Sequence, residues 1–237
     1  TLDRDNVNAI INTRPLIIGN LAFFGTTRNE IFAFETTNDF KLWSYTFDGD
    51  IESPAIQIND EVIAMLSAGG DIRVLGAREG NSILRANIAG GSVNDMLVDN
   101  GNLFVASNDQ SLYAFSLADA SRQWRKRTSK PLTVQPTIHD GVLYASTADQ
   151  GLSAFDAASG KLLWSNNDIS GWVVSIANGD ELMVWTGSSL AAVDKDSGDV
   201  IVESDLDGAA GVRADEFIDG DLYVISPTGA LAKFTLR

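Results

Sequence analysis

The sequence of 237 residues lacks cysteine, has a single histidine, and holds only 17 lysines and arginines against 32 aspartates and glutamates. Without cysteine, disulfides, cysteine-ligated zinc and thiol catalysis are excluded. The net charge of −15 argues against nucleic acid as a partner, because a phosphate backbone requires a basic surface. No apolar run approaches the length of about 20 residues that a membrane-spanning helix needs. His139 stands alone, so it offers neither a metal-binding pair nor a catalytic triad.

A repeat of about 40 residues runs along the chain. One anchor residue, at the end of the third apolar segment of each copy, marks its position. The anchors are Glu35, Gly76, Ser116, Asp156, Asp194 and Thr235, at steps of 41, 40, 40, 38 and 41 residues. Eight residues beyond the first five anchors, every residue is apolar: Trp43, Leu84, Trp124, Trp164 and Val202.

Each copy contains four short β segments separated by turns, the first segment of the last copy being "RADEFI" (213–218). Units of this length with four strands are typical of propeller blades. We therefore predict an all-β protein, a β-propeller of about six four-stranded blades that forms one domain over residues 1–237.

The conserved spacing within the repeat has a structural explanation. Asp156 with Gly160, and Asp194 with Gly198, are turn formers that connect the third strand to the fourth. The large rings of Trp43, Trp124 and Trp164 on the outer strands are expected to cover the gap between neighbouring blades. These residues are interpreted as a structural blade motif and not as a ligand site.

The last copy ends after its third β segment. The apolar segment "NVNAIINT" (6–13), within residues 1–13, could supply the missing outer strand and close the ring. The alternative is that it connects blades.

The motif "FDAASGKLLW" (155–164) resembles the repeat of the PQQ-type, or quinoprotein-like, propellers. Within that superfamily, "GSVNDMLVDNGNLFVASNDQSLYAFSL" (91–117) resembles a blade of the BamB family, propeller lipoproteins of the bacterial outer-membrane β-barrel assembly machinery. The end of the chain, "DGDLYVISPTGALAKFTLR", is also similar to that family. BamB propellers have eight blades, so this chain is either a shortened relative or lacks two repeats.

The resemblance implies a non-catalytic scaffold that binds protein partners, among them components of outer-membrane assembly. In that family two aspartates of an inter-blade loop contact the barrel-forming partner, and Asp48 and Asp50 in "DGDIESP" match them with a one-residue gap. The resemblance also implies a periplasmic or outer-membrane-associated protein, with a lipid anchor supplied by an N-terminal segment outside this sequence. We expect a monomer with no cofactor.

The alternative function is a quinoprotein-type enzyme, or another ligand-binding domain that uses the central funnel. Resemblance to such enzymes implies a calcium-bound quinone and adjacent cysteines, which this chain lacks. "ESDLDGAAG" (203–211) has part of a calcium loop but no closing carboxylate, so turn roles are expected for the acidic clusters. The basic stretch "RQWRKRTSK" (122–130) is read as either a solvated rim or a binding surface.

Overall fold

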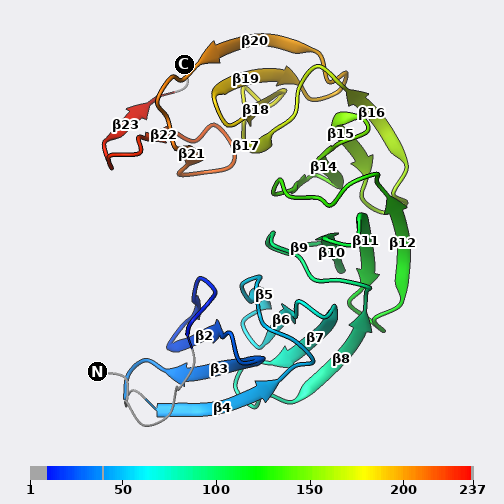
Figure 1. Ribbon diagram of the computed structural model, residues 1–237, viewed down its shortest axis with the longest axis vertical. Coiled ribbons are helices and arrows are strands. Elements are labelled where there is room, and N and C mark those ends of the chain that lie inside the picture. The colour runs from blue at the N-terminus through cyan, green and yellow to red at the C-terminus, as the bar shows by residue number, and fades with distance from the viewer. Residues whose placement is uncertain (1–9, 39, 236–237) are drawn as a thin grey trace. The chain divides into compact units, whose positions relative to one another are not determined.

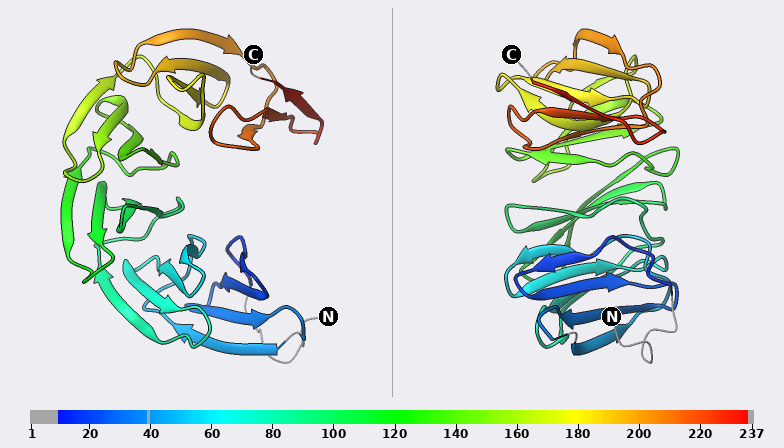
Figure 2. Two further views of the ribbon diagram at one scale, coloured as in Figure 1. Left: turned by 180° about the vertical axis from the view of Figure 1, so that it is seen from behind. Right: turned by 90° about the vertical axis from the view of Figure 1, so that its left-hand side faces the viewer.

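A computed structural model describes residues 10–38 and 40–235, and these residues form 23 β-strands in six antiparallel sheets. Figure 1 labels the strands, and Figure 2 gives two further views. The described residues fall into two compact units. The first extends to Arg127 and includes residues 131–133, and the second holds residues 128–130 and the chain from Val134 onward. Among the described residues no helix is long and apolar enough to cross a membrane.

The first unit contains three four-stranded sheets in which each strand pairs with the next along the chain (Figure 1). The first sheet has β1 Leu16–Ile18, β2 Leu21–Gly25, β3 Glu30–Glu35 and β4 Phe40–Thr46. The second has β5 Ile56–Asn59, β6 Val62–Leu66, β7 Asp71–Gly76 and β8 Ser82–Asn87. The third has β9 Leu97–Asp99, β10 Asn102–Ser107, β11 Ser111–Ser116 and β12 Arg122–Arg127.

The second unit contains two four-stranded sheets and one of three strands. The fourth sheet has β13 Thr137–His139, β14 Val142–Thr147, β15 Gly151–Asp156 and β16 Leu162–Asn166. The fifth has β17 Trp172–Ala177, β18 Glu181–Trp185, β19 Ser189–Asp194 and β20 Val200–Asp205. The sixth has β21 Gly211–Ala214, β22 Leu222–Ile225 and β23 Leu231–Phe234. Six repeats thus become six blade-like sheets, as predicted; the extent of a single domain over residues 1–237 stays a prediction.

Burial within a sheet follows the position of each strand. The two central strands are buried along most of their length, as in β10 and β11, whereas the outer β12 alternates between exposed and half-buried residues. The core lies between neighbouring sheets, where Phe23 and Ile31 of the first sheet pack with Ile63, Met65 and Leu75 of the second. Where both faces of a sheet are buried, as in the second and third sheets, the central strands read as nearly continuous apolar runs.

Two of the anchors, Asp156 and Asp194, stand at tight turns between the third and fourth strands of their sheets. The Asp156 carboxylate accepts hydrogen bonds from the amide and hydroxyl of Ser159, and the Gly160 amide donates to the Asp156 carbonyl (2.8 Å). Gly160 has a φ of 68°, which glycine adopts without strain. Asp194 and Gly198 repeat the arrangement, with a 2.8 Å bond between the Gly198 amide and the Asp194 carbonyl.

The outer-strand tryptophans lock one sheet to the next within each unit. In the first unit the Trp43 indole donates to the Ala77 carbonyl (3.0 Å), and its ring lies against Gly80 of the second sheet. In the second unit the Trp164 indole donates to the Lys195 carbonyl (2.8 Å), and its ring lies against Gly198. A Cβ on either glycine would come within 2.6 Å of ring carbon atoms. The repeated glycine therefore serves both the turn and the neighbouring tryptophan.

Trp124, the third predicted member of the blade motif, is half-buried on β12. Its ring centroid lies 6.0 Å from that of Phe104 on β10. The Trp43–Phe23 and Trp164–Tyr144 pairs have nearly the same spacing, 5.9 and 6.1 Å. Each tryptophan thus covers an aromatic residue of its own sheet.

Two segments near the ends differ from simple repeats. The segment predicted as "RADEFI" is a strand only to Ala214, because the chain beyond it pairs with β17 of the fifth sheet instead. There the Ile176 amide donates to the Phe217 carbonyl (2.7 Å), and the Asp219 amide donates to the Ile176 carbonyl (2.8 Å). The prediction was therefore wrong beyond Ala214.

At the other end, Ile11 forms an isolated bridge with Thr26, and the Asn12 amide donates to the Gly25 carbonyl (3.0 Å). Residues 10–13 occupy on the first sheet the position that residues 50–53 occupy on the second, where the Ala68 amide donates to the Asp50 carbonyl. Whether residues 6–13 close the ring or connect blades stays a prediction. Residues 6–9 lie outside the described residues.

Candidate functional site

The most distinctive surface feature of the first unit is the acidic inter-blade loop, residues 47–55, which connects β4 to β5. Exposure alternates along it: Asp48, Asp50 and Glu52 are exposed, whereas Ile51 and Ser53 are fully buried. The three carboxylates therefore face solvent, while the buried Ile51 and Ser53 hold the backbone of the loop against the sheets. Three negative charges thus stand within five residues on a surface of fixed shape.

The first sheet holds the loop through Ile51 and its neighbours. The Ile51 amide donates to the Thr26 carbonyl (3.3 Å), and the Asn12 side chain donates to the Ile51 carbonyl (3.2 Å). The Ile51 side chain packs so closely on Gly25 that a Cβ there would lie 2.3 Å from it. Only glycine admits this contact, which explains the "FFGT" ending of the strand.

The second sheet holds the loop through the turn between β6 and β7. The Ser67 hydroxyl donates to the Asp48 carboxylate (2.5 Å), and the Ala68 amide donates to the Asp50 carbonyl (2.7 Å). Gly69 lies beneath Asp48, where a Cβ would be 2.8 Å from its carboxylate oxygen. The two aspartates therefore differ: Asp48 uses one oxygen within the fold, whereas the fold holds Asp50 by its backbone.

The charge of the loop is not neutralised from within. Among the residues that the structure describes, no lysine or arginine forms an ion pair with Asp48, Asp50 or Glu52. The connection between the second and third sheets differs, because its acidic residue, Asp95, is paired with Arg14 at 2.7 Å. A rigid set of unpaired carboxylates favours a positively charged partner surface.

The two predicted site residues are therefore brought together on one exposed loop, and their role as partner contacts stays a prediction. Sequence reasoning did not include Glu52, two residues beyond Asp50, in the site. It missed Ser67, whose supporting role depends on a contact between two sheets. The only available signal was a serine at the end of an apolar strand, which is too common to point to this aspartate.

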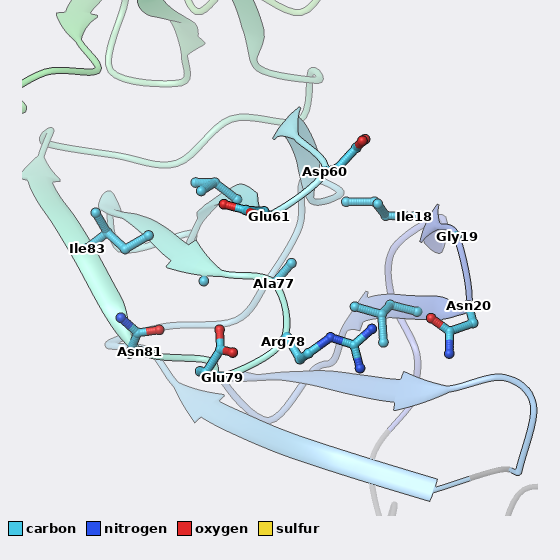
Figure 3. Close-up of a pocket in the computed structure, with 13 residues that line it drawn as sticks. Ile18, Gly19, Asn20, Asp60, Glu61, Ala77, Arg78, Glu79, Asn81 and Ile83 are labelled. Atoms are coloured by element: carbon cyan, nitrogen blue, oxygen red, sulfur yellow. The ribbon is translucent and has the colours of Figure 1, made fainter.

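A second feature of the first unit is the inter-blade cleft, a hollow of about 740 Å³ between the first and second sheets. Figure 3 shows Asn20, Asp60, Glu61, Arg78 and Glu79 around it, and these residues come from turns at one end of the two sheets. Its lining residues include no serine, threonine, histidine, lysine or tyrosine. The ionisable groups of the cleft are therefore three carboxylates and one guanidinium.

The arrangement of the acidic side chains bears on whether the protein could hold a metal ion. Among the described residues no group of three or more histidine, aspartate or glutamate side chains is placed to hold a metal ion. Asp194 instead accepts bonds from the amides of Asp196 and Ser197 in its own turn, and these bonds hold the pKa of its carboxyl below the ordinary value.

Antiparallel four-stranded sheets, interlocked through an outer tryptophan and a glycine of the next turn, define the class of PQQ-like repeat propellers. The family model described as "Outer membrane protein assembly factor BamB" matches residues 28–135 and 68–235. The chain belongs to this family. The resemblance of residues 91–117 and of the chain end is thereby confirmed.

Solved structures agree on the fold. BamB from Moraxella catarrhalis is 16% identical with a TM-score of 0.73, and the match covers 98% of this chain and 78% of that one. The computationally designed Ika8 protein is 11% identical with a TM-score of 0.80, covering 98% and 73%. The designed Ika4 protein is 9% identical with a TM-score of 0.57, covering 64% and 94%. No curated protein matches the chain.

Proposed function

We propose that the chain is a non-catalytic propeller scaffold of the bacterial cell envelope, which binds a protein partner of outer-membrane protein assembly through its acidic inter-blade loop. Membership of the BamB family supports the setting. The observation that carries the binding role is the set of exposed carboxylates of Asp48, Asp50 and Glu52. No lysine or arginine in the described part of the chain pairs with them, and two sheets hold the backbone of their loop.

The rigidity of the loop favours recognition. Both flanking sheets hydrogen-bond its backbone, so the carboxylates lose little conformational freedom when a partner binds. Their charge would attract and orient a basic surface. The function thus depends on shape and charge at the rim of a blade and on no reacting group. A periplasmic location, at or near the outer membrane, follows from the same proposal.

The test is a binding measurement with the purified periplasmic domains of the barrel-forming component of the assembly machinery. Isothermal titration calorimetry should give a dissociation constant for the wild-type chain. Asp50→Lys should raise this constant about tenfold or more, because it replaces an attractive charge by a repulsive one at a side chain that the fold does not use. Asp48→Asn should weaken binding less, since the amide oxygen still accepts from Ser67.

Asp60→Lys is the matched control. It makes the same change of charge at an exposed residue of the inter-blade cleft, in the turn between β5 and β6. Equal loss of affinity with Asp50→Lys and Asp60→Lys would mean that net charge, and not the loop, governs binding. Loss with Asp60→Lys alone would move the partner site to the cleft.

A further inference from the structure

The outer strand of the third sheet, β12, carries an unusual concentration of positive charge. Four of its six residues are basic, Arg122, Arg125, Lys126 and Arg127, in a chain with 17 lysines and arginines and a net charge of −15. β12 pairs only with β11, so its other side is a free edge of the sheet. Along such an edge alternate backbone N–H and C=O groups point outward and are open to another strand.

An irregularity in the strand aligns three arginines. Arg127, Arg125 and Arg122 lie opposite Ser111, Tyr113 and Phe115 of β11, and the register shifts between Ala114 and Phe115. Residues two apart on β11 share a face, so their partners on β12 share it too. Without the shift Arg122 would lie on the opposite face. The three guanidinium groups therefore form a row along one face of the edge.

Only the central arginine of the row is neutralised. Arg125 contacts the Asp109 carboxylate (3.3 Å) and the Ser111 hydroxyl (3.0 Å), and lies 5.2 Å from the centroid of the Tyr113 ring. Arg122 and Arg127 are exposed, and neither forms an ion pair with any described residue. Arg125 is thus held in place, with an unpaired arginine on either side of it.

Protection of the edge against aggregation does not explain this row. Charged residues on outer strands do serve that purpose. The outer strand of the fourth sheet, β16 Leu162–Asn166, nevertheless has no charged residue, β4 and β8 have one each, and β20 has two, both acidic. Three aligned arginines exceed the number of charged residues on any of these other outer strands.

We propose that β12 is a docking strand for an extended acidic segment of a protein partner, which adds to the free edge of the third sheet. Side chains on one face of an extended peptide recur about every 7 Å. The three arginines lie opposite every second residue of β11, which matches that repeat. Guanidinium groups bind carboxylates in a planar, two-pronged manner, which favours aspartate and glutamate at those positions. A lipid headgroup or a free phosphate could use the charge but not the backbone edge. This surface is separate from the acidic inter-blade loop and has the opposite charge, so it goes beyond the proposed function.

The test uses the whole chain and a fluorescein-labelled seven-residue peptide of alternating glutamate and threonine, followed by fluorescence anisotropy. Binding should weaken severalfold as salt rises from low to physiological concentration. The variant Arg122→Glu/Arg127→Glu should bind about tenfold or more weakly. Arg78→Glu, an exposed arginine of the second sheet, is the control variant and should bind as the wild type does.

Two further probes separate strand addition from attraction by charge alone. A peptide of the same sequence in which every backbone nitrogen is methylated keeps the carboxylates but cannot donate backbone hydrogen bonds, and it should bind at least tenfold more weakly. Amide hydrogen exchange should slow at Arg122–Arg127 when the first peptide is added. Equal binding of the N-methylated peptide, or unchanged exchange in β12, would overturn the proposal. Tighter binding to vesicles containing phosphatidylglycerol than to the peptide would overturn it in favour of a membrane.

Discussion

The contact between Trp164 and Gly198 gives a sharp prediction about stability. Gly198 has a φ of 80°, and a Cβ built on it would lie 2.4 to 2.9 Å from atoms of the Trp164 ring. Gly179 in the same sheet has a φ of 78° but open space where its Cβ would lie. Gly198→Ala and Gly179→Ala therefore share a backbone penalty and differ in the clash.

The magnitudes separate the two variants. A left-handed backbone costs an alanine about 1–2 kcal/mol in either position. At Gly198 the ring cannot move aside without losing the indole bond to the Lys195 carbonyl, so overpacking adds about 1–3 kcal/mol. We expect Gly179→Ala to lower the free energy of unfolding by about 1–2 kcal/mol and Gly198→Ala by about 2–5 kcal/mol.

Urea unfolding followed by far-ultraviolet circular dichroism measures both values. Trp164→Leu in the Gly198→Ala background should restore part of the loss, because the smaller side chain makes room for the methyl group. Equal destabilisation by the two alanine variants, or no recovery in the double variant, would refute the interlock as the reason for this glycine.

Three further predictions concern single residues. Trp43→Phe should lower the free energy of unfolding by about 1–2 kcal/mol in urea titrations, because the Ala77 carbonyl loses its indole donor; unchanged stability would contradict this. The Ser159 hydroxyl and amide lower the pKa of the Asp156 carboxyl. The resulting stabilisation is present above the pKa that Asp156 has in the unfolded chain, and it is lost as pH falls through its pKa in the folded protein. Ser159→Ala should therefore raise the pKa of Asp156 in an NMR titration, and an unchanged pKa would contradict the assignment. Burial raises the pKa of Tyr144 from 10.0 to about 12. The contribution of neutral Tyr144 to stability is therefore complete below pH 10 and lost as pH approaches 12. Ultraviolet absorbance should detect the late ionisation of Tyr144, and ionisation near pH 10 would contradict its burial.

The fold was predictable because its signals are local and recur in each repeat. The Asp156–Gly160 turn and the tryptophan eight residues beyond the anchor carry the same chemistry in several blades, so one interpretation is checked by several copies. Pairing of Phe217 with the fifth sheet was not predictable, since it occurs once and joins residues about 40 positions apart.

The candidate site was predictable only in part, because several of its contacts occur once and join residues from different sheets. The family resemblance pointed to Asp48 and Asp50, and their exposure follows from a polar loop between apolar strands. The Ser67 contact and the close approach of Ile51 to Gly25 depend on how two sheets meet. The arginine row of β12 depends on a shift of register that composition does not reveal.

The most direct test of the scaffold role is photo-crosslinking inside living bacteria. A benzoyl-phenylalanine in place of Asp50, at the exposed centre of the acidic inter-blade loop, should crosslink to the barrel-forming component of outer-membrane assembly. The same residue in place of Asp60 should not. Crosslinks from position 60 alone, or from neither position, would contradict the assignment of this loop as the partner-binding surface.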